Sequence, residues 1–321
     1  MENQESTIKE KSEILFLYES NYSIPNGDPF TGEQRYDEET KNILVSDVRI
    51  KRFIRDYLEE HGENIYVSNK TEGGNTDAKT VLKWIAQNRN PEKKMDVGEI
   101  LKDQIDVRLF GGISTLGDDA KKIKIDKKPL INGHVQFTGP LQFSLLNPSL
   151  NKVNLRMHQN TSHFKSSAEK QQGSIGTTTV VPYAMMQIHG WMNPKVAKDT
   201  GLSTDDISKM FKALWYGTSG DGSSHSRSKI GQDSILLLQI IYSKPNQKIY
   251  GVDKLINIKS KNGKKEEQWR SMEDFELDFS KLIKASKSQK VSKIKYYTEV
   301  EDIYNAFKDF EKFEKLNFEN K

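Results

Sequence analysis

Three long apolar runs place the tightest limit on the fold of this chain, because they are typical of buried strands. EILFLYES (13–20) fits a strand buried on both faces, and TVVPYAMMQIHGWM (179–192) and DSILLLQIIYS (233–243) predict two more strands. Helical patterns at 45–58 and 202–217 lie between them. This order predicts an α+β sheet with helices on one face, and a ferredoxin-like core is the natural candidate.

Weaker patterns fill the space between these runs. ENIYVSN (63–69) is a candidate second strand, and GHVQFTGPLQFSLL (133–146) alternates as one long, interrupted strand. Residues 70–105 are polar with short helical patterns, which predicts an insertion. DVRLFGGIS (106–114) is an apolar segment that ends in a Gly-Gly loop. The sequence therefore predicts a core decorated with inserted segments.

Two further stretches differ from the rest of the chain. Residues 147–179 lack apolar periodicity and are rich in Ser, Thr, Asn and Gln, which predicts a protruding excursion. The tail, 244–321, is rich in lysine and predicts a helix over 299–318. Its lysine run at 281–295 either binds nucleic acid without sequence preference or solvates the chain.

The helix predicted at 45–58 carries an apolar stripe and a basic arc. Ser46 fits its N-cap. The stripe has the spacing of one helix face directed at a core, so the basic groups beside it are held fixed, as phosphate binding requires. From spacing alone, an ordinary solvated face balanced by acids is the more common explanation. The stripe consists of Ile50, Phe53, Ile54, Tyr57 and Leu58, and the arc consists of Lys51, Arg52 and Arg55.

Composition excludes several classes of function. The 321 residues allow one or two domains, and a net charge of +4 is too small to establish a polyanionic partner. The absence of cysteine excludes disulfide scaffolds, thiolate zinc sites and cysteine nucleophiles. No HExxH, Walker or GxSxG spacing occurs, which favours a binding or scaffold protein without metal or cofactor. The charged N-terminus and the lack of an apolar run of about 20 residues predict a soluble, intracellular protein.

Three loops carry further candidate residues. Asp28 sits in the turn PNGDP, where it is either a metal ligand, a base or simply good turn chemistry, and the last is favoured. Gly111 and Gly112 follow Phe110 and permit close approach of a ligand, although a buried aromatic beside a tight turn is the more frequent explanation. A glycine-rich loop with two cations, Arg227 and Lys229, suits a polyanion and open solvent equally.

Taken in order, these segments resemble one known family. The motifs are SIPNGDP (23–29), VSDVRIKRFIRDYL (45–58), DVRLFGG (106–112), TGPLQFS (138–144), VPYAMMQIHGWMNPKVAKDTGLS (181–203) and ALWYGTSGDGSSHSRSKIGQ (213–232). The chain is similar to the CRISPR-associated, crRNA-binding backbone subunit of Cascade, in the DevR/Csh/Csd group and most like subtype I-B. The resemblance covers residues 12–243 in collinear order.

This resemblance implies an α+β, RRM-like (ferredoxin-like) palm with a fingers insertion and a thumb excursion. The palm comprises 12–68, 106–146 and 179–243, the fingers 69–105 and the thumb 147–178, followed by a lysine-rich C-terminal extension at 244–321. It also implies a cytoplasmic, non-catalytic protein without cofactor or metal. The implied partners are crRNA, target DNA, copies of the chain in a filament and other Cascade subunits.

The resemblance also changes the interpretation of the basic helix. It implies that this helix faces RNA and that the neighbouring loops line the same floor, with Met157 as a wedge at the thumb. Glutamate at both Lys51 and Arg55 is then expected to weaken RNA binding and leave the fold intact. The implied RNA-binding residues are Asn26, Ser46, Lys51, Arg52, Arg55, Arg108, Phe110, Gly111, Gly112, Arg227 and Lys229.

Two alternatives stay open at this point. Related backbone subunits of type III complexes cut RNA with an aspartate in a palm loop, and Asp28 lies in a loop of that kind. The second alternative is a general single-stranded nucleic-acid-binding protein outside CRISPR.

Overall fold

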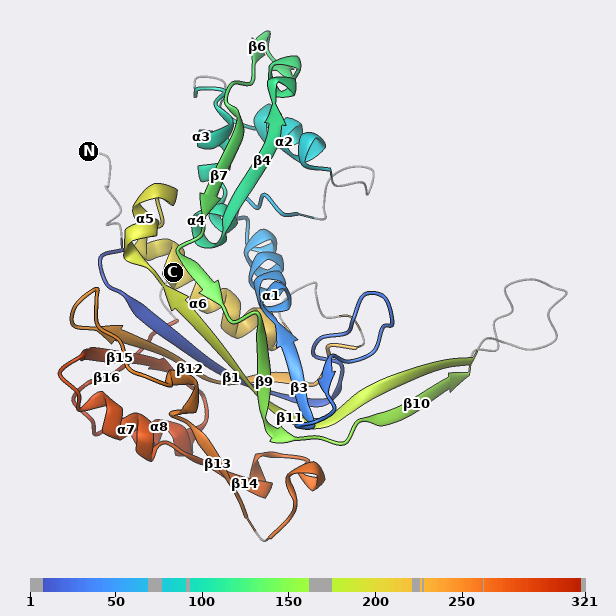
Figure 1. Cartoon of the computed structure of the whole chain (residues 1–321), viewed down its shortest axis with the longest axis vertical. Helices are drawn as coiled ribbons and strands as arrows, with labels where there is room; N and C mark the ends of the chain where they lie inside the picture. Colours follow the sequence, from blue (N-terminus) through green and yellow to red (C-terminus); the bar gives the residue numbers. More distant parts are fainter. Residues whose placement is uncertain are drawn as a thin grey trace, which may run out of the picture.

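A ten-stranded sheet forms the centre of the computed structural model, which describes residues 8–68, 77–90, 93–161, 175–220, 226, 228–261 and 263–318 (Figure 1). The strand order is β16-β15-β12-β1-β11-β9-β3-β2, and β8 and β10 also pair with β11. The strands are β1 (Ser12–Ser23), β2 (Tyr36–Asp37), β3 (Asn42–Ser46), β8 (Leu141–Phe143), β9 (Leu146–Lys152), β10 (Arg156–Thr161), β11 (Ile175–Met192), β12 (Gln232–Tyr242), β15 (Val291–Tyr297) and β16 (Phe313–Lys315).

The three apolar runs lie side by side in this sheet, as the sequence predicts. β1 is antiparallel to both of its neighbours, and Phe16 is level with Ile188 of β11 and Leu237 of β12. Successive β1 side chains enter two different cores, since Phe16 belongs to one hydrophobic cluster and Leu17 to the other. Both of these side chains are fully buried, so β1 is covered on both faces.

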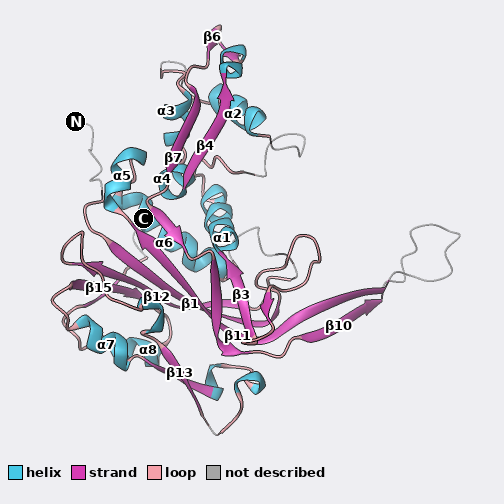
Figure 2. Ribbon diagram, viewed as in Figure 1, coloured by secondary structure: helices cyan, strands magenta, loops and turns pink. Residues whose placement is uncertain are grey.

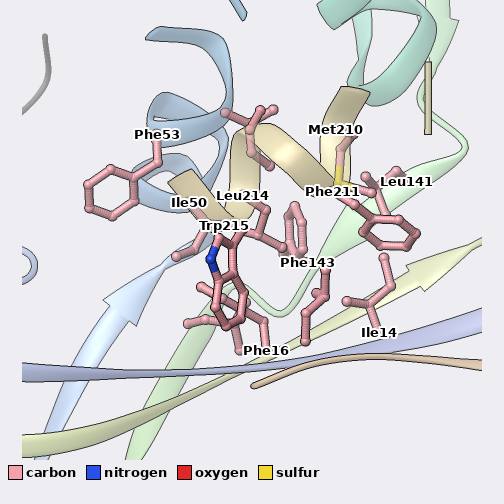
Figure 3. Close-up of a cluster of buried hydrophobic side chains, with 14 of the residues drawn as sticks. Ile14, Phe16, Ile50, Phe53, Leu141, Phe143, Met210, Phe211, Leu214 and Trp215 are labelled. Carbon is pink, nitrogen blue, oxygen red and sulfur yellow. The ribbon is translucent and has the colours of Figure 1, made fainter. Parts of the chain in front are cut away.

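Helices α1 (Asp47–Glu60) and α6 (Thr204–Thr218) cover one face of the sheet. Ser46 caps α1 as predicted, and a capping box at Ser203 begins α6. Figure 3 shows side chains of both helices meeting those of the sheet in one cluster. The predicted apolar stripe of α1 enters this cluster, with Ile50, Phe53, Ile54 and Leu58 buried and Tyr57 partly buried.

The opposite face of the sheet is covered by the C-terminal extension (Figure 1). β15 continues the sheet beside β12, and buried side chains of the extension, Trp269 among them, pack against Leu15 and Leu17. The expectation of helices on one face alone is therefore wrong. The helix predicted over 299–318 is also wrong beyond its first part, because the chain turns into β16. The extension contains β13 (Asn257–Ser260), β14 (Phe275–Asp278), α7 (Ser280–Ser286) and α8 (Glu301–Phe307).

The inserted segment builds a small subassembly with its own hydrophobic cluster. This cluster includes Leu82, Ile100 and Leu130, so residues grouped with the central sheet in the sequence analysis pack here. The candidate strand at 63–69 is wrong for its described part, because residues 63–68 form no ladder. The elements are α2 (Ala78–Gln87), α3 (Val97–Lys102), α4 (Ile105–Phe110), β4 (Gly111–Gly117), β5 (Lys124–Ile125), β6 (Lys128–Pro129) and β7 (Gly133–Thr138).

β10 and the first part of β11 form a two-stranded arm that projects from the body of the molecule (Figure 2). The first residues of the expected excursion do not project, because 147–152 lie in β9, which pairs with β3 and β11 inside the sheet. α5 (Pro194–Thr200) follows β11 at the far end of that strand. None of the helices in the described part of the chain is long and apolar enough to cross a membrane.

Candidate nucleic-acid interface

The PNGDP loop is fastened to the N-terminus of α1 by Asn26. The Asn26 side-chain oxygen accepts a hydrogen bond from the Ser46 N–H at 2.7 Å, and the Asn26 N–H donates to Gln34 Oε1 at 2.9 Å. Ser46 Oγ in turn accepts from the Arg49 N–H at 3.4 Å. Asn26 is buried, so in this structure its amide holds the loop against the helix.

Asp28, the candidate catalytic aspartate, is engaged within its own loop. Its carboxylate pairs with Arg35 at 3.0 Å and accepts from the Phe30 N–H at 2.9 Å. This is the hydrogen-bond pattern of an Asx turn closed by an ion pair. Across the described residues, no group of three or more His, Asp or Glu side chains is placed to hold a metal ion.

The three predicted cations of the basic arc each face a carboxylate. Lys51 Nζ lies 3.1 Å from Asp47 Oδ2 and 3.1 Å from Gln142 Oε1. Arg52 Nε donates to Asp56 Oδ1 at 2.6 Å. The arc is therefore largely neutralised at short range, as expected of an ordinary helix face balanced by acids.

Arg55 is bound most deeply, since its Nε donates at 2.8 Å to Asp106, whose side chain is 0% exposed. Asp106 also accepts from the N–H groups of Tyr66 and Val67. Replacing Arg55 by glutamate would oppose a second carboxylate to this buried one, which costs stability. The expectation that the Lys51 and Arg55 reversal leaves the fold intact is therefore unsupported by this geometry.

Arg108 lies on helix α4 rather than on a strand, so it and Phe110 do not alternate across a sheet. Its guanidinium grips Asp206 with two hydrogen bonds, of 2.9 Å and 2.7 Å, and donates to the carbonyls of Lys102 and Asp103. This bidentate pair joins the insertion to the first turn of α6. Arg108 is a tether between two parts of the fold in this structure.

Phe110, Gly111 and Gly112 form part of the floor under the arc. The Phe110 ring is buried, with Lys51 Nζ 5.6 Å and the Arg55 guanidinium carbon 5.2 Å from its centroid. Gly111 has a φ of 82°, and a Cβ there would lie 2.3 Å from the Phe137 carbonyl oxygen. The close pairing of β4 with β7 accounts for this glycine without a ligand.

Arg49, the fourth basic residue of α1, is the functional candidate that the sequence analysis passed over. Its guanidinium stacks on the Phe53 ring at 3.9 Å, and its Nε and Nη2 are buried without a hydrogen-bond partner among the described residues. Burial lowers the pKa of Arg49 to about 10, so it stays charged at neutral pH. The only sequence signal was an arginine four residues before a core phenylalanine.

Lys229 brings a second cation to the same place. Its Nζ donates to the carbonyl oxygen of Ile24 and, at 3.3 Å, to that of Pro25, so it joins its own loop to the PNGDP loop. Burial, with a contribution from the nearby charge of Arg49, lowers the pKa of Lys229 to about 7. Two half-buried cations with interacting charges thus have no carboxylate ion-pair partner in the described part of the chain, an arrangement that favours an incoming anion.

The two remaining predicted site residues are Met157 and Arg227. Met157 lies on β10 of the arm and is 74% exposed. Arg227 falls outside the described residues.

A large cavity of about 860 Å³ lies between the end of α1 and the insertion. Its cations are paired, with Arg89 Nε 2.6 Å from Asp103 and Arg108 bound to Asp206. Its electrostatics therefore favour an anion less than the site at Arg49 and Lys229 does.

Comparison with known proteins places the chain in a family. The sequence model described as "CRISPR-associated protein Cas7" matches residues 10–280. A protein of Haloferax volcanii named "CRISPR-associated protein Cas7" is 29% identical over 290 residues, which cover 86% of this chain and 83% of the relative. A solved structure titled "CRISPR RNA-guided surveillance complex" contains a chain with a TM-score of 0.50 and 11% identity, covering 91% of this chain and 90% of that one. The match over residues 10–280 shows that the chain belongs to the Cas7 family of CRISPR-associated proteins.

Proposed function

We propose that the chain is a non-catalytic backbone subunit of a CRISPR RNA-guided surveillance complex and that it holds guide RNA by its phosphates. The observation that carries the proposal is the pair Arg49 and Lys229, two half-buried cations without a carboxylate ion-pair partner among the described residues. They lie where the PNGDP loop and the loop before β12 meet the first half of α1. Contacts to phosphate are independent of base identity, as a subunit that serves any guide requires.

We assign the first phosphate contact to Arg49, whose guanidinium has two buried donors without a partner in the described part of the chain. The positive potential at this site also receives contributions from Lys51, Arg52 and Arg55. Each of these side chains would replace part of its carboxylate contact with a contact to phosphate. Asn26, Ser46, Arg108, Phe110 and the two glycines act by shaping the floor. Arg227 would join from the neighbouring loop.

The remaining architecture follows the family resemblance. The order β12-β1-β11-β9, with α1 and α6 on one face, supports an RRM-like palm. In this proposal the insertion forms the fingers and the β10–β11 arm forms the thumb, with Met157 as the wedge that displaces a base. Copies assemble side by side along the crRNA in the cytoplasm, beside other Cascade subunits, and present the guide to target DNA, as in subtype I-B.

Substitution of Arg49 by glutamine tests the proposal. We expect the affinity for labelled single-stranded RNA to fall about tenfold or more, because a hydrogen bond to a charged group contributes about 1.5–3 kcal/mol. The slope of log affinity against log salt should decrease by about 0.7 for each phosphate that the variant no longer neutralises. Stability should hold or rise, because the variant removes a buried charge without a partner.

Lys308→Gln is the matched control, since Lys308 is an exposed cation at the end of α8. It removes the same charge and should leave both the affinity and the salt slope unchanged. RNA binding by the combined Arg49→Gln and Lys229→Met variant that equals the wild type at every salt concentration would refute the assignment.

The two alternative functions predict different outcomes. A nuclease that uses Asp28 would release RNA fragments at a fixed spacing in Mg²⁺ and lose them in Asp28→Ala, but that carboxylate is engaged with Arg35. A general single-strand binder would copurify with RNA of many sizes, whereas the proposed function predicts one discrete RNA with repeat-derived ends.

A further inference from the structure

A second cationic cavity lies at the base of the arm. It has a volume of about 450 Å³ and is lined by four cations and one carboxylate. Leu155, which lines it, packs against the cluster shared with α1, whereas Trp269, the neighbour of the lining Arg270, packs in the cluster on the opposite face. The cations are Lys41, Arg156, Lys265 and Arg270, and the carboxylate is Glu267.

Three segments far apart in the sequence build this cavity, and backbone contacts hold them in place. The Val153 N–H donates to the Lys41 carbonyl at 2.8 Å, which fastens the β2–β3 turn to the end of β9. The Lys152 N–H donates to Glu266 Oε2 at 2.8 Å, which fastens β9 to the short helix η3 (Glu266–Gln268) of the C-terminal extension. The segments that carry these cations are therefore held together before a ligand binds.

The charge inside the cavity is unbalanced. Glu267 interacts with Lys41 at 3.4 Å, and the Arg270 guanidinium donates only to the carbonyls of Glu267 and Trp269 among the described residues. Arg156 and Lys265 are exposed and have no carboxylate partner in the described part of the chain. Because the cations outnumber the single carboxylate, the cavity favours an anion with several negative oxygens.

The position on the arm indicates the kind of anion. Arg156 is the first residue of β10, directly before Met157, and neighbouring strand residues point to opposite sides of a two-stranded ribbon. Asn154 and Gln268 add neutral hydrogen-bonding groups beside the cations. We propose that this cavity binds the phosphodiester backbone of a nucleic-acid strand that passes the base of the arm. The inference rests on the proposed function and adds a second backbone site to it.

Charge reversal with a matched control tests this site. The test variant is Arg156→Glu with Lys265→Glu, and the control is Lys284→Glu with Lys287→Glu, two exposed lysines of the same extension. The first assay, called the RNA assay, measures the binding of labelled single-stranded RNA to the protein alone. The second assay, called the DNA assay, measures the binding of labelled complementary DNA to protein that is already saturated with RNA. Thermal unfolding of all variants checks the fold, which should be unchanged because all four side chains are exposed.

We expect the test variant to bind about tenfold more weakly than the control in one of the two assays. Its slope of log affinity against log salt should be lower by about 1–2. A loss of affinity in the RNA assay assigns the site to the guide, and a loss of affinity confined to the DNA assay assigns it to the target strand. Equal binding by the test and control variants in both assays would overturn the proposed site. A cavity that binds an acidic protein partner instead would give that result.

The Arg49→Gln variant, run in the same assay, separates the two proposals. If the wild type binds RNA and Arg49→Gln does not, while the test variant equals its control, only the second site fails. If the wild type binds no RNA, the proposed function and the second site fail together.

Discussion

At the scale of single residues, the decisive property is whether a cation has a carboxylate partner. Arg55 and Arg108 are among the RNA-binding residues that the family resemblance implies, yet they bind Asp106 and Asp206 at 2.8 Å and 2.7 Å. Arg49 and Lys229 have no such partner among the described residues and keep their capacity for an external anion.

If Lys229 contacts phosphate as proposed, we expect RNA binding to depend on pH. Its pKa of about 7 means that it loses its charge near neutrality, and a bound phosphate would raise that pKa again. Affinity should therefore fall as the pH rises from roughly 6 to roughly 8.5. Binding isotherms over this range check it, with Lys229→Met expected to lose the Lys229-dependent part and Lys229→Arg to keep its affinity at high pH. If affinity falls with pH equally steeply in the wild type and in Lys229→Met, the prediction is contradicted.

The same group contributes a pH dependence of stability with a defined sign. Unfolded lysine has a pKa of 10.5, so between about 7 and 10.5 the unfolded chain binds more protons at this residue than the folded chain does. The contribution of Lys229 to the free energy of unfolding therefore rises with pH in that window and is absent from Lys229→Met. Denaturant unfolding of both proteins, compared across that pH window, would measure it.

At the scale of elements, the contact between α1 and α6 sets the position of the candidate interface. Gly217 lies in the last turn of α6 against α1, and a Cβ at this position would lie 2.8 Å from the Phe53 carbonyl oxygen and 3.1 Å from Tyr57 Cβ. The two helices pack closely here because this side chain is absent. Since α1 carries Arg49, the packing also controls the orientation of the proposed phosphate contact.

Gly217→Ala is expected to destabilise the fold, although alanine normally favours a helix over glycine by about 1 kcal/mol. The added Cβ should displace α1, which should lower the free energy of unfolding by about 1–3 kcal/mol and outweigh the gain in helix preference. Urea denaturation measures the effect, with Ser208→Ala on the exposed side of α6 as the control. A stability gain in Gly217→Ala would show that α1 shifts without cost.

At the scale of the whole molecule, the C-terminal extension is part of the core. β15 pairs with β12, and Trp269 is 1% exposed with its ring 4.8 Å from that of Phe275. These side chains cover the face of β1 that carries Leu15 and Leu17. Without the extension this face of the central strands would lie open to water.

Trp269→Ala should therefore destabilise the whole fold by about 3–5 kcal/mol, as large-to-small substitutions of buried aromatic residues do. Thermal and urea unfolding measure the change. Tyr250→Ala is the control, because Tyr250 is 86% exposed and its loss should change stability by less than about 0.5 kcal/mol. A small effect of Trp269→Ala would mean that the extension packs only peripherally.

Sequence patterns predicted those elements whose signals are local. The continuous apolar runs placed β1, β11 and β12, and the N-cap with its apolar stripe placed α1, because burial periodicity and capping involve residues within a few positions of one another. The same reasoning failed at 63–68, where a short apolar segment was taken for a strand. There the choice was made by Asp106, which binds the Tyr66 and Val67 N–H groups from 40 and 39 residues away.

The sequence by itself determined the central strands, the two helices on one face and the presence of a basic helix. Only the tertiary structure decided which of the basic side chains are left for an anion, and that the C-terminal extension closes the second face of the sheet. The physical reason is that ion pairing and desolvation depend on distances of a few ångströms between groups such as Arg108 and Asp206, 98 residues apart. No local pattern in the sequence encodes those distances.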